Sequence, residues 1–295
     1  MKAAPFEYCR AADIDEACTW LAADDGARVI AGGQTLVPMM VMRLARPTRL
    51  IDINRIAALS YIRKDGDGIA IGATTRQSVV ERDALVAAEL PLLTRAMPWI
   101  GHSATRARGT VGGSLANADP AAELPLIAVT LDAVLSYRQG GKTGTMPVRD
   151  FFVGAMTTNL PAGACLTGVR FPIWRGEKVG TGFHEVNARR SDFAFAAAAT
   201  QVEMGADGKC KRIAIGVGAA TDFPIRLESA EKQLKGTALD AKAVDSAVRE
   251  ALAGIEPMSD LHASVDYRRR AAISLTKRAV ADALSRAQGK KIHAH

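Results

Sequence analysis

The sequence predicts an α+β fold in which a larger N-terminal region precedes a smaller C-terminal domain built from an antiparallel sheet and helices. Three observations lead to this prediction. Residues 28–53 read as a strand, a glycine pair, a helix and a strand in succession. Residues 61–73 have the pattern of a β-hairpin, and residues 193–218 contain two strand patterns separated by a glycine-containing turn. The length of 295 residues is sufficient for roughly two domains.

The first unit begins with a helical pattern over 13–24, where apolar residues recur every three or four positions and Asp13 is the expected N-cap. The apolar strand 28–31 leads directly into Gly32 and Gly33. A helical segment follows over 35–44, with Pro38 tolerated in its first turn, and 50–53 is the next strand.

The second unit opens on hairpin strands around the turn 64–67. Two helical segments, a glycine-rich loop, an apolar run and two further strands complete it, over 75–87, 89–97, 110–115, 126–129, 133–137 and 165–171.

A composition shift over 172–182, where glycine and proline cluster beside charged residues, predicts a domain boundary. Beyond it we expect strands and then helices, over 193–202, 211–218, 227–234, 241–252 and 267–287. The expected division is a first subdomain over 1–57, a second over 58–176, a C-terminal domain over 177–288 and a disordered tail over 289–295.

The composition is that of an ordinary soluble globular protein, with 48% hydrophobic and 23% charged residues. Since no apolar run reaches about 18 residues and the N-terminus lacks the apolar core of a signal peptide, we expect a cytoplasmic protein without a membrane span. The net charge is +7, but the basic residues are scattered among acidic ones and aromatic residues make up only 5%. This pattern favours a solvated face, or a surface for an acidic partner, over nucleic-acid binding.

The four cysteines, Cys9, Cys18, Cys165 and Cys210, include no Cys-x-x-Cys pair. Zinc and iron–sulfur sites normally need short ligand spacings, so we expect no metal in this chain. In a cytoplasmic protein these cysteines are expected to be free thiols.

The segment Ala31-Gly32-Gly33-Gln34-Thr35 combines a strand end, two glycines and a helix start. Glycine permits close backbone approach and positive φ, and a helix N-terminus favours an anion, so this segment suits a pyrophosphate. An ordinary strand–turn–helix connection is the alternative. The segment is neither Gly-x-Gly-x-x-Gly nor a P-loop, which disfavours a standard dinucleotide-binding Rossmann unit and an NTPase.

A second candidate loop runs from Arg108 to Pro120 and places glycines, hydroxyls, an amide and a carboxylate close together. A lone glycine pair is often only a turn. The dense small and polar composition around Gly112 and Gly113 favours contact with a ligand.

Together these loops resemble the flavin-binding subunits of molybdenum-containing hydroxylases, the family that includes carbon monoxide dehydrogenase and xanthine dehydrogenase. The resemblance covers nearly the whole chain, and its matching stretches are 31–40, 50–53, 71–75, 108–125, 188–194 and 267–269. It implies an FAD-binding domain of two subdomains, of the PCMH type, followed by the smaller C-terminal domain.

The resemblance also implies roles for individual residues. The pyrophosphate and ribityl part would be held by Ala31, Gly32, Gly33, Gln34, Thr35 and Leu36, and by Thr110, Gly112, Gly113 and Ser114. Asp119 and Glu123 would lie along the flavin, Ile100 and Leu166 would wall its ring, and Phe193 would cover a ring face. Many relatives carry a lysine near this position that reaches the flavin. Here the run is Phe183-His184-Glu185, so His184 would either substitute for that lysine at the flavin or have no role there.

Each role has a structural alternative. Ile100, Leu166 and Phe193 are equally compatible with an ordinary core, and a lone histidine such as His184 is usually structural. Asp119 before Pro120 is a common turn pair. Glu123 could instead cap a helix interrupted by Pro125. Arg189 and Arg190 are compatible with a solvated pair or with a loop-fixing ion pair to Asp192.

The implied function is electron transfer through bound FAD. A small partner subunit with [2Fe–2S] clusters would supply the electrons and a large molybdopterin subunit would oxidise the organic substrate, in a dimer of heterotrimers. FAD would pass the electrons to an external acceptor, for which a quinone, a cytochrome or another carrier is favoured over NAD because no nicotinamide site is evident. The alternatives are a stand-alone FAD oxidase, disfavoured because neither glycine loop holds a histidine for covalent attachment, and a scaffold that has lost flavin.

Overall fold

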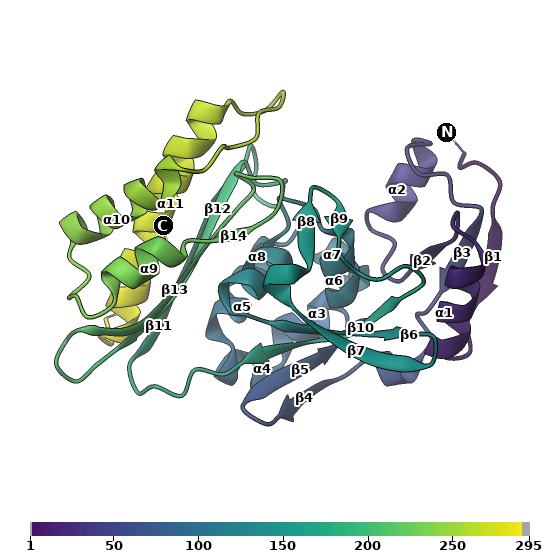
Figure 1. Ribbon diagram of the computed structural model, residues 1–295, viewed down its shortest axis with the longest axis horizontal. Helices are drawn as coiled ribbons and strands as arrows, with labels where there is room; N and C mark the ends of the chain where they lie inside the picture. Colours follow the sequence, from purple (N-terminus) through teal and green to yellow (C-terminus); the bar gives the residue numbers. More distant parts are fainter. Residues whose placement is uncertain (1, 291–295) are drawn as a thin grey trace.

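The computed structural model describes residues 2–290, and its strands form three main sheets that follow one another along the chain (Figure 1). The first sheet is parallel, in the order β1-β3-β2. Its elements are β1 (Glu7–Arg10), α1 (Ile14–Ala23), β2 (Arg28–Ile30), α2 (Leu36–Val41) and β3 (Arg49–Asp52). The predicted strand–glycine–helix–strand unit is confirmed, while β1 has no apolar alternation and its sequence did not predict a strand.

Helix α1 joins the first sheet to the second. Its N-cap is Asp13, as predicted, because the Asp13 carboxylate accepts a hydrogen bond from the Glu16 amide at 2.9 Å. On the buried face, the Cys18 thiol donates to the carbonyl of Arg138 in the second sheet at 3.2 Å. The Arg138 guanidinium also pairs with Asp15 at 2.6 Å, so one helix contacts both sheets.

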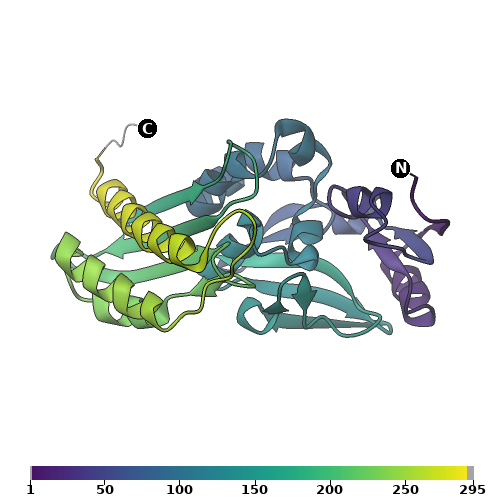
Figure 2. The same cartoon turned by 90° about the horizontal axis from the view of Figure 1, so that it is seen from above.

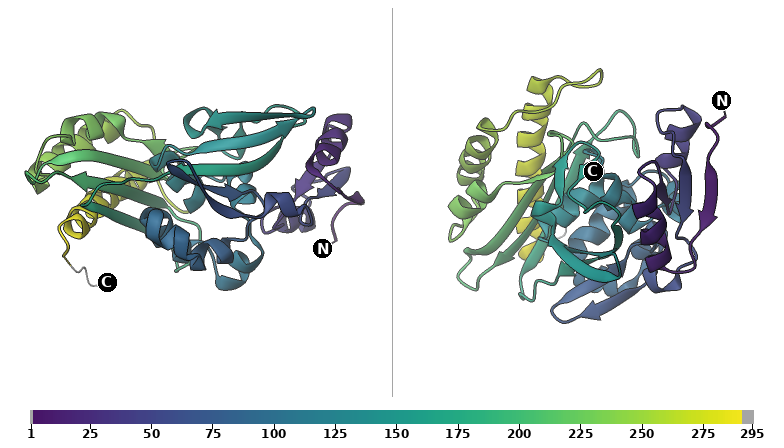
Figure 3. Two further views of the ribbon diagram at one scale, coloured as in Figure 1. Left: turned by 90° about the horizontal axis from the view of Figure 1, so that it is seen from below. Right: turned by 45° about the vertical axis from the view of Figure 1, so that its right-hand side comes forward.

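The second sheet is antiparallel, in the order β4-β5-β10-β6-β7, and helices cover one of its faces (Figure 3). Its strands are β4 (Ile62–Asp65), β5 (Gly68–Gly72), β6 (Val134–Gln139), β7 (Lys142–Pro147) and β10 (Cys165–Pro172). The helices are α3 (Gln77–Arg82), α4 (Ala84–Glu89), α5 (Pro91–Ala96), α6 (Ser103–Arg108), α7 (Val111–Asn117) and α8 (Glu123–Thr130). Short 3-10 turns and a small hairpin complete the region, at η1 (Ala57–Leu59), η2 (Met97–Trp99), η3 (Val148–Asp150), β8 (Phe152–Gly154) and β9 (Thr157–Thr158).

Three local predictions for this region are wrong. The helical segment predicted over 75–87 is divided because Asp83 ends α3 and caps α4 through the Val86 amide. The predicted loop 110–115 is instead the N-terminal part of α7, because Thr110 caps the helix and its apolar residues are buried. Pro125 does not interrupt α8, since it lies in the first turn, where no intrahelical amide bond is lost.

The third sheet is antiparallel, in the order β11-β12-β13-β14, and both of its faces are covered. Its elements are β11 (Val179–Val186), β12 (Ala196–Met204), β13 (Cys210–Gly218), β14 (Ile225–Arg226), α9 (Glu228–Leu234), α10 (Ala241–Ala253) and α11 (Val265–Ala287). The long helix α11 lies across one face (Figure 2), and α5 and α8 of the preceding region contact the other. For this reason every residue of β12 is buried.

Of the predicted tail 289–295, residues 291–295 lie outside the described part of the chain. The amide of Lys290 bonds to the carbonyl of Ser285 at 3.0 Å and so extends the last turn of α11. Within residues 2–290, no helix has both the length and the apolar character needed to cross a bilayer.

Two glycines of β11, Gly180 and Gly182, allow the backbone of α11 to pack close to the strand. A Cβ atom at Gly182 would overlap the backbone of Ala279, and one at Gly180 would overlap the backbone of Ala283. Because a helix backbone cannot yield as a flexible side chain can, we predict that Gly182→Val lowers the free energy of unfolding by about 3 kcal/mol or more. Denaturant unfolding followed by circular dichroism measures the change.

The matched control is Gly254→Ala, because a Cβ atom there meets no other atom within 4 Å. This variant should stay within about 0.5 kcal/mol of wild type. Equal stabilities for the two variants would show that the close packing of β11 on α11 is not required.

Candidate functional site

The segment between β2 and α2 presents a row of open backbone donors. The amides of residues 32–36 have no acceptor among residues 2–290. Gly33 has φ +69°, the left-handed region that glycine adopts without strain, and this conformation turns the chain into α2. Successive free amides at the start of a helix form a site for an anion such as a phosphate. The predicted loop of Ala31, Gly32, Gly33, Gln34, Thr35 and Leu36 is therefore assembled as one surface, with Gln34 exposed and the other five partly buried.

The second predicted loop lies directly against the first. A Cβ atom at Gly32 would lie 2.7 Å from the Arg108 carbonyl oxygen and 2.9 Å from the Cα atom of Gly109. Only glycine therefore allows the two backbones to meet at this point. The two loops are far apart in sequence, and the structure brings them together as expected for two parts of one site.

A polar network that the sequence analysis missed connects the loops. The Asn54 side-chain amide donates to the Ala31 carbonyl at 2.8 Å, and the Asn54 side-chain oxygen accepts from the Arg76 guanidinium at 2.7 Å. Arg76 also donates to the Arg108 carbonyl. Burial, and then the nearby charge of Arg108, lower the pKa of Arg76. The sequence signals for this network were the positions of Asn54 and Arg76, directly after the matching stretches 50–53 and 71–75.

The amides of the second loop are mostly used within the protein. The Gly112 amide bonds to the Ala73 carbonyl at 2.9 Å, the Gly113 amide to the Thr110 hydroxyl at 3.1 Å, and the Ser114 amide to the Thr110 carbonyl at 3.1 Å. Gly112 is buried, and a Cβ atom there would lie 2.5 Å from that of Ala73. Gly112 and Thr110 thus start α7 close to the first loop, while Gly113 is exposed and Ser114 is partly exposed.

The two apolar residues predicted to wall a ring are nearly buried. Ile100 follows η2 and is 7% exposed, and Leu166 lies at a bulge of β10 and is 5% exposed. Both belong to the largest core cluster. Their positions are compatible with packing in the core, and the small exposed part of each side chain could also contact a ligand at the edge of the core.

Strand alternation decides the direction of the side chains on β11. His184 contacts Asp282 of α11, with 3.3 Å between its Nε2 atom and the carboxylate, and burial lowers its pKa. Phe183, its neighbour, packs instead against Trp99 of η2, with ring centroids 6.0 Å apart. Glu185 shares the face of Phe183. The histidine therefore has a structural partner, and the acidic residue beside it faces the second sheet's helices.

Three carboxyl groups gather where α8 meets the third sheet. One oxygen of Glu185 accepts from the Asn187 side chain at 2.9 Å, and the other is buried without a partner among the described residues. Burial, reinforced by the charge of Glu123, raises the pKa of Glu185 to about 9. Burial likewise raises the pKa of Glu123, the first residue of α8, to about 7, and raises the pKa of Asp119.

Phe193 projects from the connection between β11 and β12. This loop is closed by the Phe195 amide, which bonds to the Val186 carbonyl at 2.7 Å. The predicted ion pair inside it is confirmed, with 3.0 Å between Arg189 and Asp192. Phe193 is 70% exposed and is therefore not a core residue.

Two family models match the chain. The FAD binding domain in molybdopterin dehydrogenase matches residues 4–174, and the CO dehydrogenase flavoprotein C-terminal domain matches residues 181–283. The chain is also 36% identical over 293 residues to 6-hydroxypseudooxynicotine dehydrogenase complex subunit alpha of Paenarthrobacter nicotinovorans, covering 99% of this chain and 98% of that one. It is 36% identical to the carbon monoxide dehydrogenase medium chain of Afipia carboxidovorans, covering 96% and 98%.

Solved structures agree with these sequence matches. Reconstituted CO dehydrogenase from Oligotropha carboxidovorans superimposes with a TM-score of 0.94 and 34% identity, covering 97% of this chain and all of that one. Quinoline 2-oxidoreductase from Pseudomonas putida 86 superimposes with a TM-score of 0.91 and 34% identity, covering 98% and 99%.

The buried carboxyls predict a pH dependence of stability. The pKa of Glu185 is about 9 in the folded protein and 4.5 ordinarily, so the protonated side chain adds to the free energy of unfolding. This contribution is fully present below about pH 4.5 and is lost as the pH rises toward 9. We expect the thermal midpoint of the FAD-free protein to fall more steeply between about pH 6 and 9 in wild type than in Glu185→Gln. Glu177→Gln, at an exposed position, is the control and should retain the wild-type slope. Identical slopes for wild type and Glu185→Gln would contradict the assignment.

Proposed function

Since the chain belongs to the family of FAD-binding subunits of molybdopterin dehydrogenases, we propose that it holds FAD as the electron outlet of a larger complex. A large molybdenum subunit would oxidise the organic substrate, and the [2Fe–2S] clusters of a small subunit would deliver the electrons to this chain. Bound FAD supplies the chemistry of accepting two electrons and releasing them to an external acceptor.

The observation that supports this function most directly is the row of open amides over residues 32–36. A pyrophosphate carries negative charge and needs several converging donors, and the start of α2 supplies them. The contact of Gly32 with the Arg108 carbonyl places the second loop beside this row. We propose that the pyrophosphate and ribityl part of FAD lie across this junction, between the first loop and Thr110, Gly113 and Ser114.

The flavin ring would then extend along α8 toward the third sheet. Ile100 and Leu166 would contact it from the core side, and Phe193 would cover it from the loop between β11 and β12. Glu123 and Asp119 would lie along its edge. Glu185 lies on the side of β11 that faces this region, so it replaces His184 as the residue of β11 that we place near the ring. Raised pKa values allow Glu123 and Glu185 to hold protons beside the cofactor near neutral pH.

A test of the pyrophosphate assignment is Gly33→Val. A side chain is strained at φ +69° and changes the turn that aligns the open amides. We expect the Kd for FAD to rise about tenfold or more, because each charge-assisted hydrogen bond contributes about 1.5–3 kcal/mol. The ratio of flavin absorbance to protein, and titration of the FAD-free protein with FAD, measure this loss.

Gly66→Val is the matched control, since Gly66 also has a positive φ of 59° but lies in the β4–β5 hairpin, away from both loops. It should bind FAD as wild type does. Wild-type affinity in Gly33→Val would refute the assignment. An FAD-loaded wild-type chain that oxidises an organic substrate without partner chains would instead support the stand-alone oxidase.

The partner subunits need a surface on this chain, and α2 together with the turn that follows it offers an apolar one. Met42 is 51% exposed and Leu44 is 71% exposed, and Val37 and Val41 on the same segment are also exposed. Helix α2 lies above β2 and β3, at the upper end of the first sheet in the view of Figure 1. Exposed apolar patches of this kind commonly mark protein interfaces. We propose that α2 contacts a partner subunit within a dimer of heterotrimers.

We predict that the double variant Met42→Glu and Leu44→Glu loses its partner chains while keeping its FAD, because buried charges oppose association. Native mass spectrometry of the purified complex identifies the chains and reports the loss. Val79→Glu, at an equally exposed valine on α3, is the control and should leave the complex intact. An intact complex in the double variant would place the interface elsewhere.

A further inference from the structure

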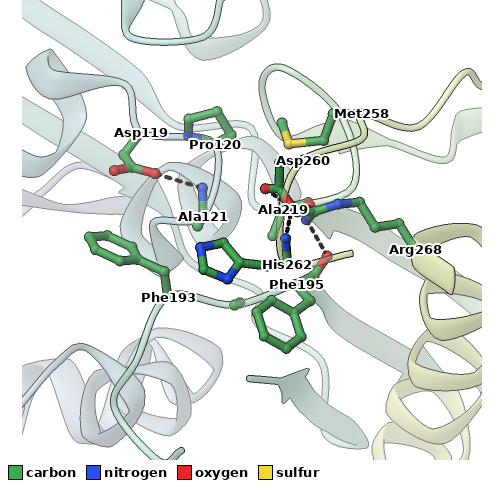
Figure 4. A pocket seen from close by; sticks show the side chains of 11 residues that line it. Asp119, Pro120, Ala121, Phe193, Phe195, Ala219, Met258, Asp260, His262 and Arg268 are labelled. Atoms are coloured by element: carbon green, nitrogen blue, oxygen red, sulfur yellow. Dashed lines mark hydrogen bonds and ion pairs between the residues drawn. The ribbon is translucent and has the colours of Figure 1, made fainter. Parts of the chain in front are cut away.

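The C-terminal domain contains a cavity that the proposed function does not use. A first cavity in this part of the molecule, of about 210 Å³, is lined by Asp119 and Phe193 (Figure 4) and belongs to the flavin site proposed above. A second one, of about 190 Å³, lies between the start of β13 and the C-terminal end of α9, and we call it the edge cavity. It is lined by Lys211, Arg212, Ile213, Glu231, Lys232 and Lys235.

The edge cavity lies over a gap in the outer edge of β13, the side of the strand that faces away from β12. At one end of the gap, the amide and the carbonyl of Ile215 bond to the Glu231 carboxylate and the Leu227 amide, at 2.8 and 2.9 Å. At the other end, the amide and the carbonyl of Cys210 bond to the backbone of residues 236–237, at 2.7 and 2.8 Å. Strand β14 pairs with β13 only beyond this gap, so the edge between the two ends has no neighbouring strand among residues 2–290.

Ile213 lies inside this gap with both of its backbone groups open. Successive residues of an antiparallel strand direct their amide and carbonyl alternately to one edge and to the other. Since Ile215 directs both groups away from β12, Ile213 does so too, because it lies two residues earlier in the same unbroken register. Neither group has a hydrogen-bond partner within the described part of the chain, and Ile213 is only 4% exposed. A buried amide and carbonyl without partners are unfavourable, so a ligand that both accepts and donates hydrogen bonds would stabilise this edge.

Three lysines give the rim of the edge cavity a positive charge. Lys211 is paired with Glu203 at 2.8 Å, and Lys232 lies 3.9 Å from Glu228, at the limit of an ion pair. Lys235 is exposed and forms no ion pair with the described residues. The lysines are therefore only partly neutralised by the protein, and their charge favours an anion.

The single carboxylate in the lining does not oppose an anion. Both oxygens of Glu231 accept hydrogen bonds from the Arg226 guanidinium, at 2.8 and 3.0 Å, and one of them also accepts from the Ile215 amide. The Arg212 guanidinium lies over the ring of Trp174, with 3.9 Å between its carbon and the ring centroid, and within residues 2–290 it has no carboxylate partner. The lining of the edge cavity therefore has an excess of positive charge.

An anion that also donates a hydrogen bond meets both conditions. An ionised carboxylate and a sulfate ion accept hydrogen bonds only, so either would leave the Ile213 carbonyl without a partner. Hydrogenphosphate carries negative charge and keeps one hydroxyl group at neutral pH, so it can accept from the Ile213 amide and donate to the Ile213 carbonyl. The volume of 190 Å³ is below the roughly 300 Å³ of a drug-sized site, which favours a small anion over a nucleotide.

We propose that the edge cavity is a binding site for hydrogenphosphate. The Ile213 amide donates to one phosphate oxygen, and the phosphate hydroxyl donates to the Ile213 carbonyl. Lys232 and Lys235, at the end of α9, balance the charge of the ion. The edge cavity shares no residue with the proposed flavin site, so this proposal does not depend on the proposed function.

The test uses the purified complex in phosphate-free buffer, with inorganic phosphate as the probe and sulfate as the comparison. Calorimetry at neutral pH and constant ionic strength measures the Kd of each ion. We expect phosphate to bind about tenfold or more tightly than sulfate, because sulfate leaves the buried Ile213 carbonyl unpaired. In the double variant Lys232→Gln and Lys235→Gln, the Kd for phosphate should rise about tenfold, since two charged donors are lost.

The matched control is Lys142→Gln and Lys242→Gln, which changes the net charge equally at two exposed lysines that do not line the edge cavity. This control should bind phosphate as wild type does, and the FAD content of all three proteins should be the same. Absence of phosphate binding, equal affinities for phosphate and sulfate, or an equal loss of affinity in the two double variants would overturn the proposal and leave the proposed function intact. A complex without FAD would instead overturn the proposed function.

Discussion

The contact between the backbone at Gly32 and the carbonyl of Arg108 is the constraint on which the site depends. It joins a parallel sheet of short strands to a separate antiparallel sheet at a place where no side chain can stand. The bonds from Asn54 to the Ala31 carbonyl and from Arg76 to Asn54 and the Arg108 carbonyl hold the junction in register. With the second loop's amides already bonded internally, the open donors of residues 32–36 remain for a ligand. Binding groups are thus preorganised before any ligand arrives, which reduces the entropy lost on binding.

The third sheet has a different role, because its two faces lie in different environments. Successive side chains of β11 point alternately to one face and to the other. One face of β11 meets α11, where His184 finds Asp282, and the other face meets the helices of the second sheet, where Glu185 approaches Glu123. The sequence Phe-His-Glu therefore sends a carboxyl group, not an imidazole, toward the region proposed for the flavin ring. Burial outweighs the opposing charge of Arg106 on Glu123, so both carboxyls stay protonated to a higher pH than isolated glutamates.

Much of the fold could be predicted from local pattern. The Asp13 cap, the strand before Gly32, the hairpin around Gly66 and the C-terminal helices all appear because periodicity, caps and turn residues agree with the final structure. The helix α7 could not be predicted, because two glycines disfavour a helix locally and only burial of Val111 and Leu115 against the sheet overcomes this.

The residues of the site also divide into those that local sequence identifies and those that only the folded structure brings together. The glycine loops were identifiable because their function requires particular backbone conformations, which restrict the residue type. The network of Asn54 and Arg76 and the bonds from Arg268 to the carbonyls of Phe195 and Ala219 depend on contacts between segments distant in sequence, and no single segment contains their signal. The direction of His184 could not be predicted either, since β11 was not recognised as a strand and its alternation was therefore unknown.

Helix α11 links the two ends of the C-terminal domain mechanically. Near its C-terminal end, Gly180 and Gly182 let its backbone rest directly on β11, so it cannot slide or rotate without a clash. Near its N-terminal end, Arg268 holds the Phe195 carbonyl at the base of the loop that presents Phe193. The position of Arg268, and with it the base of the Phe193 loop, is therefore determined at the other end of the same helix, where Gly180 and Gly182 fix the helix on the sheet. A larger side chain at either glycine would disturb the Phe193 loop without contacting it.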